Sequence, residues 1–188
     1  NSLYKRYLIK LHLFYSTKII LLSKLFTLDK PLKHFQKKII IIPNSLSKED
    51  SFISKEFFKK RYEILENKSQ QEIIKFIYSG NIQSAKGIHE IIKAIKQINA
   101  KKLNIKIQLD IYGMKFEEID PKANNIFYKG KLKHSDRLKI MSKYDFLISA
   151  SKTEGLPITI IECMAIGLPF ITTNVGAIED LLINNYPY

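Results

Sequence analysis

The chain has 188 residues, 45% hydrophobic residues and a formal net charge of +13. This length holds one medium domain or parts of two with a proper core, and this apolar content excludes a disordered or fibrous protein. The single cysteine, Cys163, excludes a disulfide framework and a thiolate metal cluster, and we expect it to be a small packing residue.

The positive charge comes from 31 basic and 18 acidic residues that are spread along the whole chain. This balance fits an anionic partner, whether nucleic acid, acidic lipid or a phosphorylated substrate. It also fits a composition rich in Lys, Ile and Asn that has no bearing on function. No aromatic-basic nucleic-acid motif occurs, so nucleic acid is not an expected partner.

Both ends of the chain look cut. The first residue is Asn1 rather than Met, and the closing INNYPY carries no helix-end signal. We therefore expect an internal fragment of a longer protein.

An apolar stretch near the start, YLIKLHLFYSTKIILLSKLF, raises the question of a membrane span. Lys10, Lys18 and Lys24 interrupt it and leave no uncharged run near the ~20 residues that a spanning helix needs. No small-residue cleavage site follows it, which disfavours a secretory signal. We expect a cytoplasmic protein, with peripheral contact at the inner face of the cytoplasmic membrane as a further expectation.

The first part of the chain is expected to form a helix, a buried strand, a second helix and a strand of consecutive isoleucines, at residues 3–15, 18–23, about 24–36 and 37–45. A run that is apolar on both faces suits a parallel strand covered by helices on both sides. Pro43 and Asn44 form a turn, and a polar, charged stretch follows to about Lys75. We place a domain boundary here, which divides the chain into residues 1–43 and 44–188.

The second part alternates regularly between strands and helices. Strands are expected at residues 76–80, 105–113, 125–130, 145–151 and 169–173, and helices at 88–98, 135–142, 157–166 and 177–182. Ser135 is the expected N-cap of its helix. This order predicts an α/β fold with a Rossmann-like parallel sheet and helices on both faces, whose ligands bind at the carboxyl ends of the strands.

The loop GNIQSAKG, residues 80–87, lies between a strand and a helix. Backbone amides at a helix N-terminus favour anions, and Lys86 adds a full positive charge, so the loop suits a diphosphate. It lacks the order of a P-loop. A lysine before a helix is also commonly just solvated, so the loop is a weak signal alone.

Two glutamates flank a Gly-Leu-Pro turn in TEGLPITIIECMAIGLPFITT. Gly155 permits close approach of the backbone to a ligand, and Pro157 suits the first turn of a helix. Glu162 lies in an otherwise apolar helix and needs partners, because an unpaired buried charge is costly. The hydroxyls of a ribose suit Glu162, and those of an attached sugar suit Glu154. The alternative is that Glu154 caps the loop and Glu162 pairs with a lysine.

The run EGLPITIIECMAIGLPFITTNVGAIEDLL resembles the donor-binding signature of retaining glycosyltransferases of family 4, which have the GT-B architecture. That signature places two glutamates at the spacing of Glu154 and Glu162, before a helix-strand unit of the EAMA-G-PV type. Upstream, KIIIIPNSL resembles the junction between the two domains, and FIYSGNIQSAKGIHEIIKAI resembles the donor loop. The resemblance covers about residues 37 to 182 and implies a fragment that lacks most of the N-terminal acceptor-side domain and the C-terminal end.

The resemblance implies a role for each matching residue. Glu162 binds the ribose, Glu154 positions the transferred sugar as the catalytic residue, Lys86 neutralises the diphosphate, and the amides around Gly155 and Leu156 contact the donor. Its implied reaction is transfer from a nucleotide-diphosphate sugar to an acceptor hydroxyl with retention of configuration. The leaving phosphate assists the incoming hydroxyl.

The resemblance also sets the expected substrates. UDP-sugars are favoured over GDP-sugars, the acceptor is a glycan or lipid-linked glycan of capsule or lipopolysaccharide synthesis, and no cofactor or metal is expected because no D-x-D motif occurs. One departure is Asn81, which replaces the usual arginine of the donor loop. A GT-B-like sugar-nucleotide epimerase and a non-catalytic basic binding module are the alternative functions.

Overall fold

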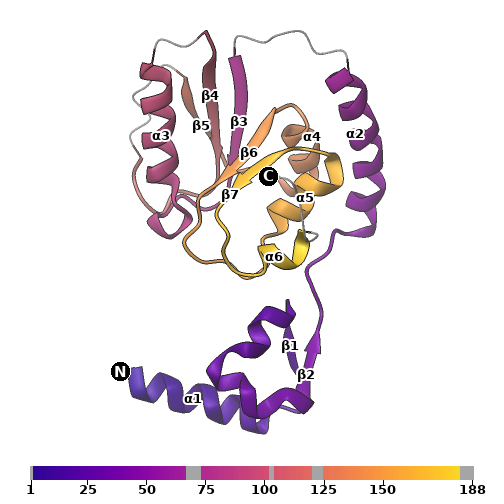
Figure 1. The fold of residues 1–188 in the computed structure, drawn as a ribbon, viewed down its shortest axis with the longest axis vertical. Coiled ribbons are helices and arrows are strands. Elements are labelled where there is room, and N and C mark those ends of the chain that lie inside the picture. The colour runs from indigo at the N-terminus through magenta and orange to yellow at the C-terminus, as the bar shows by residue number, and fades with distance from the viewer. Residues whose placement is uncertain (1, 67–72, 102–103, 120–124, 183–188) are drawn as a thin grey trace. The chain divides into compact units, whose positions relative to one another are not determined.

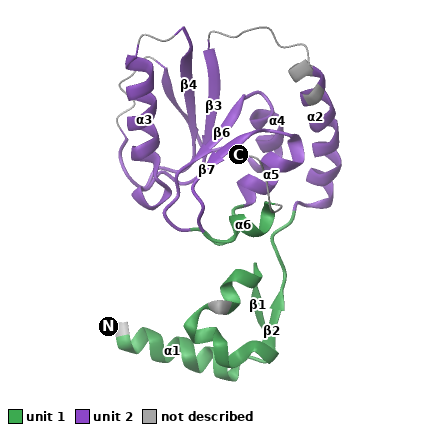
Figure 2. Ribbon diagram, viewed as in Figure 1, with its two compact units in different colours: residues 1–45, 154–157, 176–188 green, residues 46–153, 158–175 purple. Residues whose placement is uncertain are grey.

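The computed structural model describes residues 2–66, 73–101, 104–119 and 125–182. It divides into two compact units (Figure 2). Unit 1 comprises residues 1–45, 154–157 and 176–188, and unit 2 comprises residues 46–153 and 158–175. The predicted domain boundary after residue 43 stays a prediction.

Unit 2 is built on a five-stranded parallel sheet of order β5-β4-β3-β6-β7 (Figure 1). Its strands are β3 (Ile73–Ser79), β4 (Lys106–Tyr112), β5 (Ile126–Gly130), β6 (Phe146–Ser149) and β7 (Phe170–Thr172). Its helices are α2 (Lys48–Glu66), the 3₁₀ turn η3 (Ser84–Lys86), α3 (Ile88–Ala100), the 3₁₀ turn η4 (His134–Asp136), α4 (Arg137–Met141) and α5 (Ile158–Ile166).

Helices cover both faces of this sheet, as the sequence predicts (Figure 1). One face packs on α3 through a core of apolar side chains at helical and strand spacing, which includes Ile88, Ile91, Ile95, Leu109 and Ile111. On the other side α2, α4 and α5 lie together, and α2 packs along α5. The carboxyl ends of all five strands therefore share one edge, where the loops lead into the helices.

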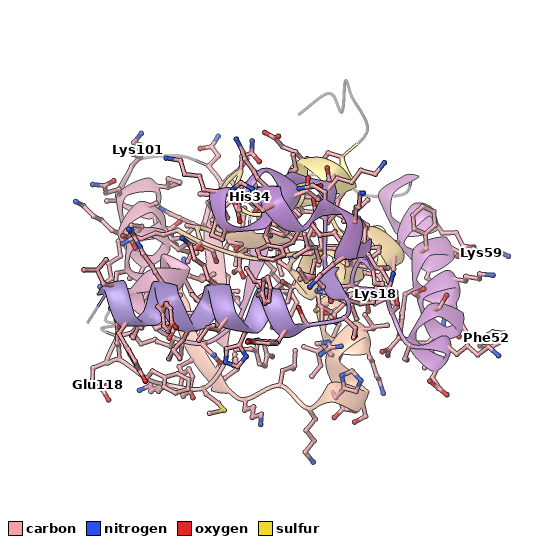
Figure 3. The ribbon with its side chains drawn as sticks, turned by 90° about the horizontal axis from the view of Figure 1, so that it is seen from below. Lys18, His34, Phe52, Lys59, Lys101 and Glu118 are labelled. Carbon is pink, nitrogen blue, oxygen red and sulfur yellow. The ribbon has the colours of Figure 1, made fainter. Side chains whose placement is uncertain are left out.

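Helix α2 lies in the stretch that the sequence analysis leaves as a polar segment. Its inward face has the spacing of a helical stripe, but polar residues occupy much of it: Ser54 and Arg61 are buried and Asp50 is half-buried. Phe52 and Lys59 point outward (Figure 3), and Phe52 is 81% exposed. Apolar periodicity misses this helix because its buried side carries polar side chains, Ser54 and Arg61, that are hydrogen-bonded to backbone carbonyls.

The predicted N-cap at Ser135 is wrong. Ser135 lies inside η4, whose N-cap is the extended residue Lys133, and no side chain caps either η4 or α4. The helix therefore begins as a 3₁₀ turn that runs directly into α4, without the extended backbone that an N-cap at Ser135 requires.

Unit 1 contains α1 (Ser2–Tyr15), β1 (Ile19–Leu21), the 3₁₀ helices η1 (Lys24–Leu28) and η2 (Lys30–Lys38), β2 (Ile39–Ile41) and α6 (Ile178–Leu181). Strands β1 and β2 pair in parallel, with Ile20 opposite Ile40. Lys38 ties the end of α1 to this sheet, because its Nζ donates to the carbonyls of Phe14 at 2.6 Å and Ser16 at 2.9 Å. In the part of the chain that the structure describes, no helix has both the length and the apolar character to span a bilayer.

Candidate functional site

The loops at the carboxyl edge of β3 and β6 are packed against each other within unit 2. Gly87 has a left-handed backbone with φ of 67°, and a Cβ there would lie 2.0 Å from the carbonyl oxygen of Ala150. Lys152 N–H donates to the Ala85 carbonyl at 2.9 Å, and Lys152 Nζ lies 2.9 Å from Glu90 Oε1. Only glycine permits this approach, so the loop of residues 80–87 is held directly beside the end of β6.

Glu117, from the loop after β4, fixes the turn that carries Lys86. Its Oε2 accepts from the Ser84 amide at 2.9 Å and from the Ser84 hydroxyl at 2.5 Å, and it lies 3.1 Å from His89 Nε2. These hydrogen bonds lower the pKa of Glu117 to about 2, with Ser84 contributing most. The Lys86 side chain is half-buried on this anchored turn. The side chain of the neighbouring Asn81 is exposed, and its carbonyl accepts from Tyr78 Oη at 2.7 Å.

Glu162 is a completely buried carboxylate in the second turn of α5, and its side chain is 0% exposed. Arg137 Nη2, from the first turn of α4, lies 2.5 Å from Glu162 Oε1. Neither carboxylate oxygen accepts a well-aligned hydrogen bond from the described residues, and the Arg137 Nε–H is likewise without an acceptor among them. The contact is a close ion pair that leaves hydrogen-bonding capacity on both partners.

The surroundings of this pair contain further charges. Burial is the main cause that raises the pKa of Glu162 to about 7; Arg137 opposes this shift and Asp50 of α2 adds to it. Asp50 Oδ2 lies 3.7 Å from His134 Nε2 of η4. The next residue along α5, Cys163, is fully buried as predicted, and burial raises the pKa of its thiol. Glu162 thus belongs to a cluster of ionisable side chains from α2, η4, α4 and α5, in which Glu162 itself is fully buried and His134 lies at the exposed edge.

The remaining predicted site residues lie in unit 1. The Leu156 carbonyl accepts from Asn44 Nδ2 at 2.6 Å, and the Gly155 carbonyl accepts from the Ala177 amide at 2.8 Å. Leu156 is buried and Glu154 is half-buried. The structure therefore brings the loop of residues 154–157 together with residues 44 and 177 in unit 1, and places Lys86 and Glu162 in unit 2.

Sequence reasoning missed two residues that shape these loops. It proposed a lysine as the alternative partner for Glu162, whereas the structure shows Arg137. A signal was present, because a cation in the first turn of a helix is disfavoured by the helix dipole unless an anion lies nearby. Glu117 carries no comparable signal, since its role depends on the meeting of two loops far apart in the sequence.

The profile of the family described as "Glycosyl transferases group 1" matches residues 59–187. The uncharacterized glycosyltransferase MJ1178 of Methanocaldococcus jannaschii is 30% identical over 99% of this chain and 48% of its own length. The capsular polysaccharide biosynthesis glycosyltransferase CapM of Staphylococcus aureus is 27% identical over 93% of this chain and 48% of its own length. The chain thus spans about half the length of these curated relatives.

Solved structures agree on the fold. The pneumococcal O-GlcNAc transferase GtfA, in complex with UDP and GlcNAc, superposes with a TM-score of 0.62 at 19% identity, over 98% of this chain and 35% of its own. WaaG, a glycosyltransferase involved in lipopolysaccharide biosynthesis, superposes with a TM-score of 0.58 at 19% identity, over 85% of this chain and 45% of its own. The α/β fold with its parallel sheet is therefore of the GT-B type.

Proposed function

Because this chain belongs to the glycosyl transferases group 1 family, we propose that it acts in transfer of a sugar from a nucleoside diphosphate donor to an acceptor hydroxyl. The observation that carries the donor assignment is the buried Glu162, whose oxygens accept no hydrogen bond from the described residues although the carboxylate is fully desolvated. Hydroxyl groups are suitable donors to such a carboxylate, and the ribose of a nucleotide supplies two of them side by side.

Lys86 is proposed to bind the diphosphate. It lies on the turn that Glu117 and Gly87 hold at the carboxyl edge of the sheet, immediately before α3. A cation at this position stabilises the negative charge that grows on the leaving diphosphate as the bond to the sugar breaks. The roles of Glu154, Gly155 and Leu156 toward the sugar rest on the sequence resemblance.

The proposed reaction retains the configuration at the anomeric carbon and uses no metal. The bond between the anomeric carbon and the diphosphate oxygen breaks, the acceptor oxygen bonds to the same face, and the hydroxyl proton passes to the leaving diphosphate. Glu154 positions the sugar in this scheme. The names of CapM and WaaG support cell-surface polysaccharide, in capsule or lipopolysaccharide, as the class of product.

Nucleotide binding tests this proposal. Calorimetry on the complete gene product with UDP, GDP, ADP and their sugar conjugates is expected to show selective binding, with a UDP-sugar favoured. Glu162→Gln and Lys86→Met are each expected to weaken binding about tenfold or more, which corresponds to about 1.4 kcal/mol. Matched controls are Glu118→Gln and Lys101→Met, because Glu118 is 90% exposed and Lys101 follows the far end of α3.

A folded protein that binds no nucleotide, or binds all of them equally through charge, would contradict the proposal. Turnover with and without an acceptor then separates a transferase from a sugar-nucleotide epimerase. A transferase consumes donor in proportion to the acceptor supplied, whereas an epimerase converts the donor without one.

Contact with an anionic membrane surface is proposed for unit 1. A groove of about 1070 Å³ between α1 and η2 is lined by apolar side chains together with Arg6, Lys10, Lys30 and His34. Asp29 is the only acidic residue among residues 1–48. Apolar side chains beside basic ones suit the boundary between lipid headgroups and acyl chains.

Vesicle sedimentation of the complete gene product tests this contact. We expect the protein to sediment with vesicles that contain phosphatidylglycerol and not with vesicles of pure phosphatidylcholine. Lys10→Glu is expected to weaken the binding to the phosphatidylglycerol vesicles. Lys101→Glu serves as the control for net charge. Equal weakening by both substitutions, or no retention at all, would contradict a specific contact through this groove.

A further inference from the structure

The ion pair of Arg137 with Glu162 joins two helices at the carboxyl edge of the sheet in unit 2. Arg137 belongs to the first turn of α4, directly after β5 and η4, and Glu162 belongs to α5, directly after β6. Their contact of 2.5 Å is made with a carboxylate that is 0% exposed. A buried carboxylate with a cation at this distance is restrained by packing and by Coulombic attraction, and such restraint is a requirement for any group that binds a ligand selectively.

The pair is incompletely satisfied. Oε2 of Glu162 and the Nε–H of Arg137 have no hydrogen-bond partner among the described residues. In a purely structural buried pair, the attraction between the charges offsets the free energy of desolvation only when the remaining lone pairs and protons are also hydrogen-bonded. The unmet capacity therefore points to a hydroxyl-bearing ligand, because a hydroxyl donates to a carboxylate.

Without Arg137 the carboxylate has little to keep it charged. Arg137 is the one group that lowers the pKa of Glu162; burial and the negative charge of Asp50 raise it. His134 lies near Asp50, and Cys163 on the same helix is buried and protonated because burial raises its pKa. When Glu162 is protonated, it offers one strong acceptor fewer, and its O–H becomes a donor that itself needs an acceptor.

We propose that Arg137 is a positioning residue of the donor site, which keeps the Glu162 carboxylate ionised and turned so that its second oxygen accepts the ribose hydroxyls of a nucleoside diphosphate. The proposal rests on the proposed function for the identity of the ligand. The state of Glu162 in the free protein is independent of that function. The two parts are therefore tested separately.

The first arm needs no ligand. NMR titration of the glutamate side-chain carboxyl carbons, with Glu162→Gln to assign the signal, follows the ionisation of Glu162 in wild type, Arg137→Lys and Arg137→Met. The Glu162 midpoint is expected to rise in Arg137→Met and to stay close to wild type in Arg137→Lys. Lys139→Met, an exposed basic residue on the same helix, is the control and leaves the midpoint unchanged. An unchanged midpoint in a folded Arg137→Met overturns the proposal.

The second arm measures UDP binding by calorimetry between about pH 6 and pH 9, the range around the raised pKa of Glu162. Arg137→Met is expected to weaken binding about tenfold or more near neutral pH, and raising the pH is expected to restore part of it. Arg137→Lys is expected to rescue most of the affinity. In a Glu162→Gln background, Arg137→Met is expected to have little further effect, because the two residues act as one unit.

The outcomes separate the two proposals. Tighter UDP binding by Arg137→Met overturns the positioning role, because Arg137 would then compete with UDP for Glu162. A loss of affinity that is the same at every pH and in the Glu162→Gln background also overturns it, because Arg137 would then contact UDP independently of Glu162. A wild type that binds no nucleotide, together with a shifted Glu162 titration in Arg137→Met, overturns the proposed function and supports the role of Arg137 toward Glu162.

Discussion

Glu162 shows how burial and charge compete at a single residue. Its side chain is fully buried, and desolvation raises its pKa from 4.5 to about 7 in spite of Arg137. A carboxylate buried for packing alone would be replaced at little cost by an apolar residue of similar size. Its presence in an apolar helix is therefore not explained by packing alone.

The raised pKa predicts a pH dependence of stability. In the folded protein Glu162 loses its proton with a midpoint of about pH 7, and above it the carboxylate is ionised beside Arg137, whereas the unfolded chain loses the proton near 4.5. The contribution to the free energy of unfolding is therefore fully present below about pH 4.5 and is lost as the pH rises through about 7, with a total of about 3 kcal/mol.

Denaturant unfolding of wild type and Glu162→Gln at several pH values measures this contribution. The difference between their unfolding free energies is expected to change by up to about 3 kcal/mol across this window, since glutamine does not titrate. A difference that stays constant between pH 5 and about 8 would show that Glu162 is already ionised in the fold.

Gly87 offers a second test at this scale, with Gly130 as its matched control. Both have positive φ, 67° and 80°, but a Cβ on Gly87 meets the Ala150 backbone at 2.0 Å, whereas a Cβ on Gly130 meets nothing within 4 Å. Gly130→Ala is expected to cost about 1–2 kcal/mol from backbone strain alone. Gly87→Ala is expected to cost about 3 kcal/mol or more, measured by denaturant unfolding, because the loop also has to move. Equal losses of unfolding free energy in the two variants would show that the loop moves to accept the Cβ at Gly87 without further cost.

At the scale of elements, α2 is attached to the sheet through a buried arginine. Arg61 Nη1 donates to the Tyr144 carbonyl at 2.5 Å, and Nη2 donates to the Asp145 carbonyl at 2.9 Å, immediately before β6. Arg61 is 7% exposed. This attachment holds the helix that carries Asp50 against the helices of the Glu162 cluster.

Replacing this arginine is expected to be costly. Arg61→Met removes two charge-assisted hydrogen bonds and leaves two carbonyls without their donor, with an expected loss of about 2–3 kcal/mol in the free energy of unfolding. The control is Lys60→Met on the same helix, because Lys60 is 60% exposed and pairs with Glu56 on the surface. Its expected cost is within about 0.5 kcal/mol. Similar costs for the two variants would contradict the attachment.

Predictability differed among the elements for physical reasons. The strands and α3 are recognisable because their apolar residues repeat at the strand or helix period, and Ile88, Ile91 and Ile95 are indeed buried. Helix α2 was missed because its buried side contains Ser54 and Arg61 in place of an apolar stripe. The N-cap at Ser135 was wrong because a 3₁₀ turn precedes α4.

The whole molecule carries a charge of +13, which predicts nonspecific anion binding in addition to the proposed nucleotide site. Retention on heparin, through scattered surface lysines, is expected to disappear between about 0.1 M and 1 M salt, as the Debye length falls from about 10 Å to 3 Å. Selective nucleotide binding through Glu162 and Lys86 is expected to weaken far less. Titration of both ligands at the two salt concentrations distinguishes them. A parallel loss of both would show that the nucleotide binds through surface charge.

The sequence by itself determined the fold class, the broad glycosyltransferase group and the positions of the two spaced glutamates, while the finer assignment to retaining family 4 stays a prediction. These depend on local periodicity and on motifs whose residues are near one another in the chain. Only the tertiary structure decided that Arg137 faces Glu162, that Glu117 holds the turn of Lys86, and that Arg61 anchors α2. The physical reason is that a buried charge pairs with whichever group lies near it in space, and this proximity depends on how several helices pack on the sheet.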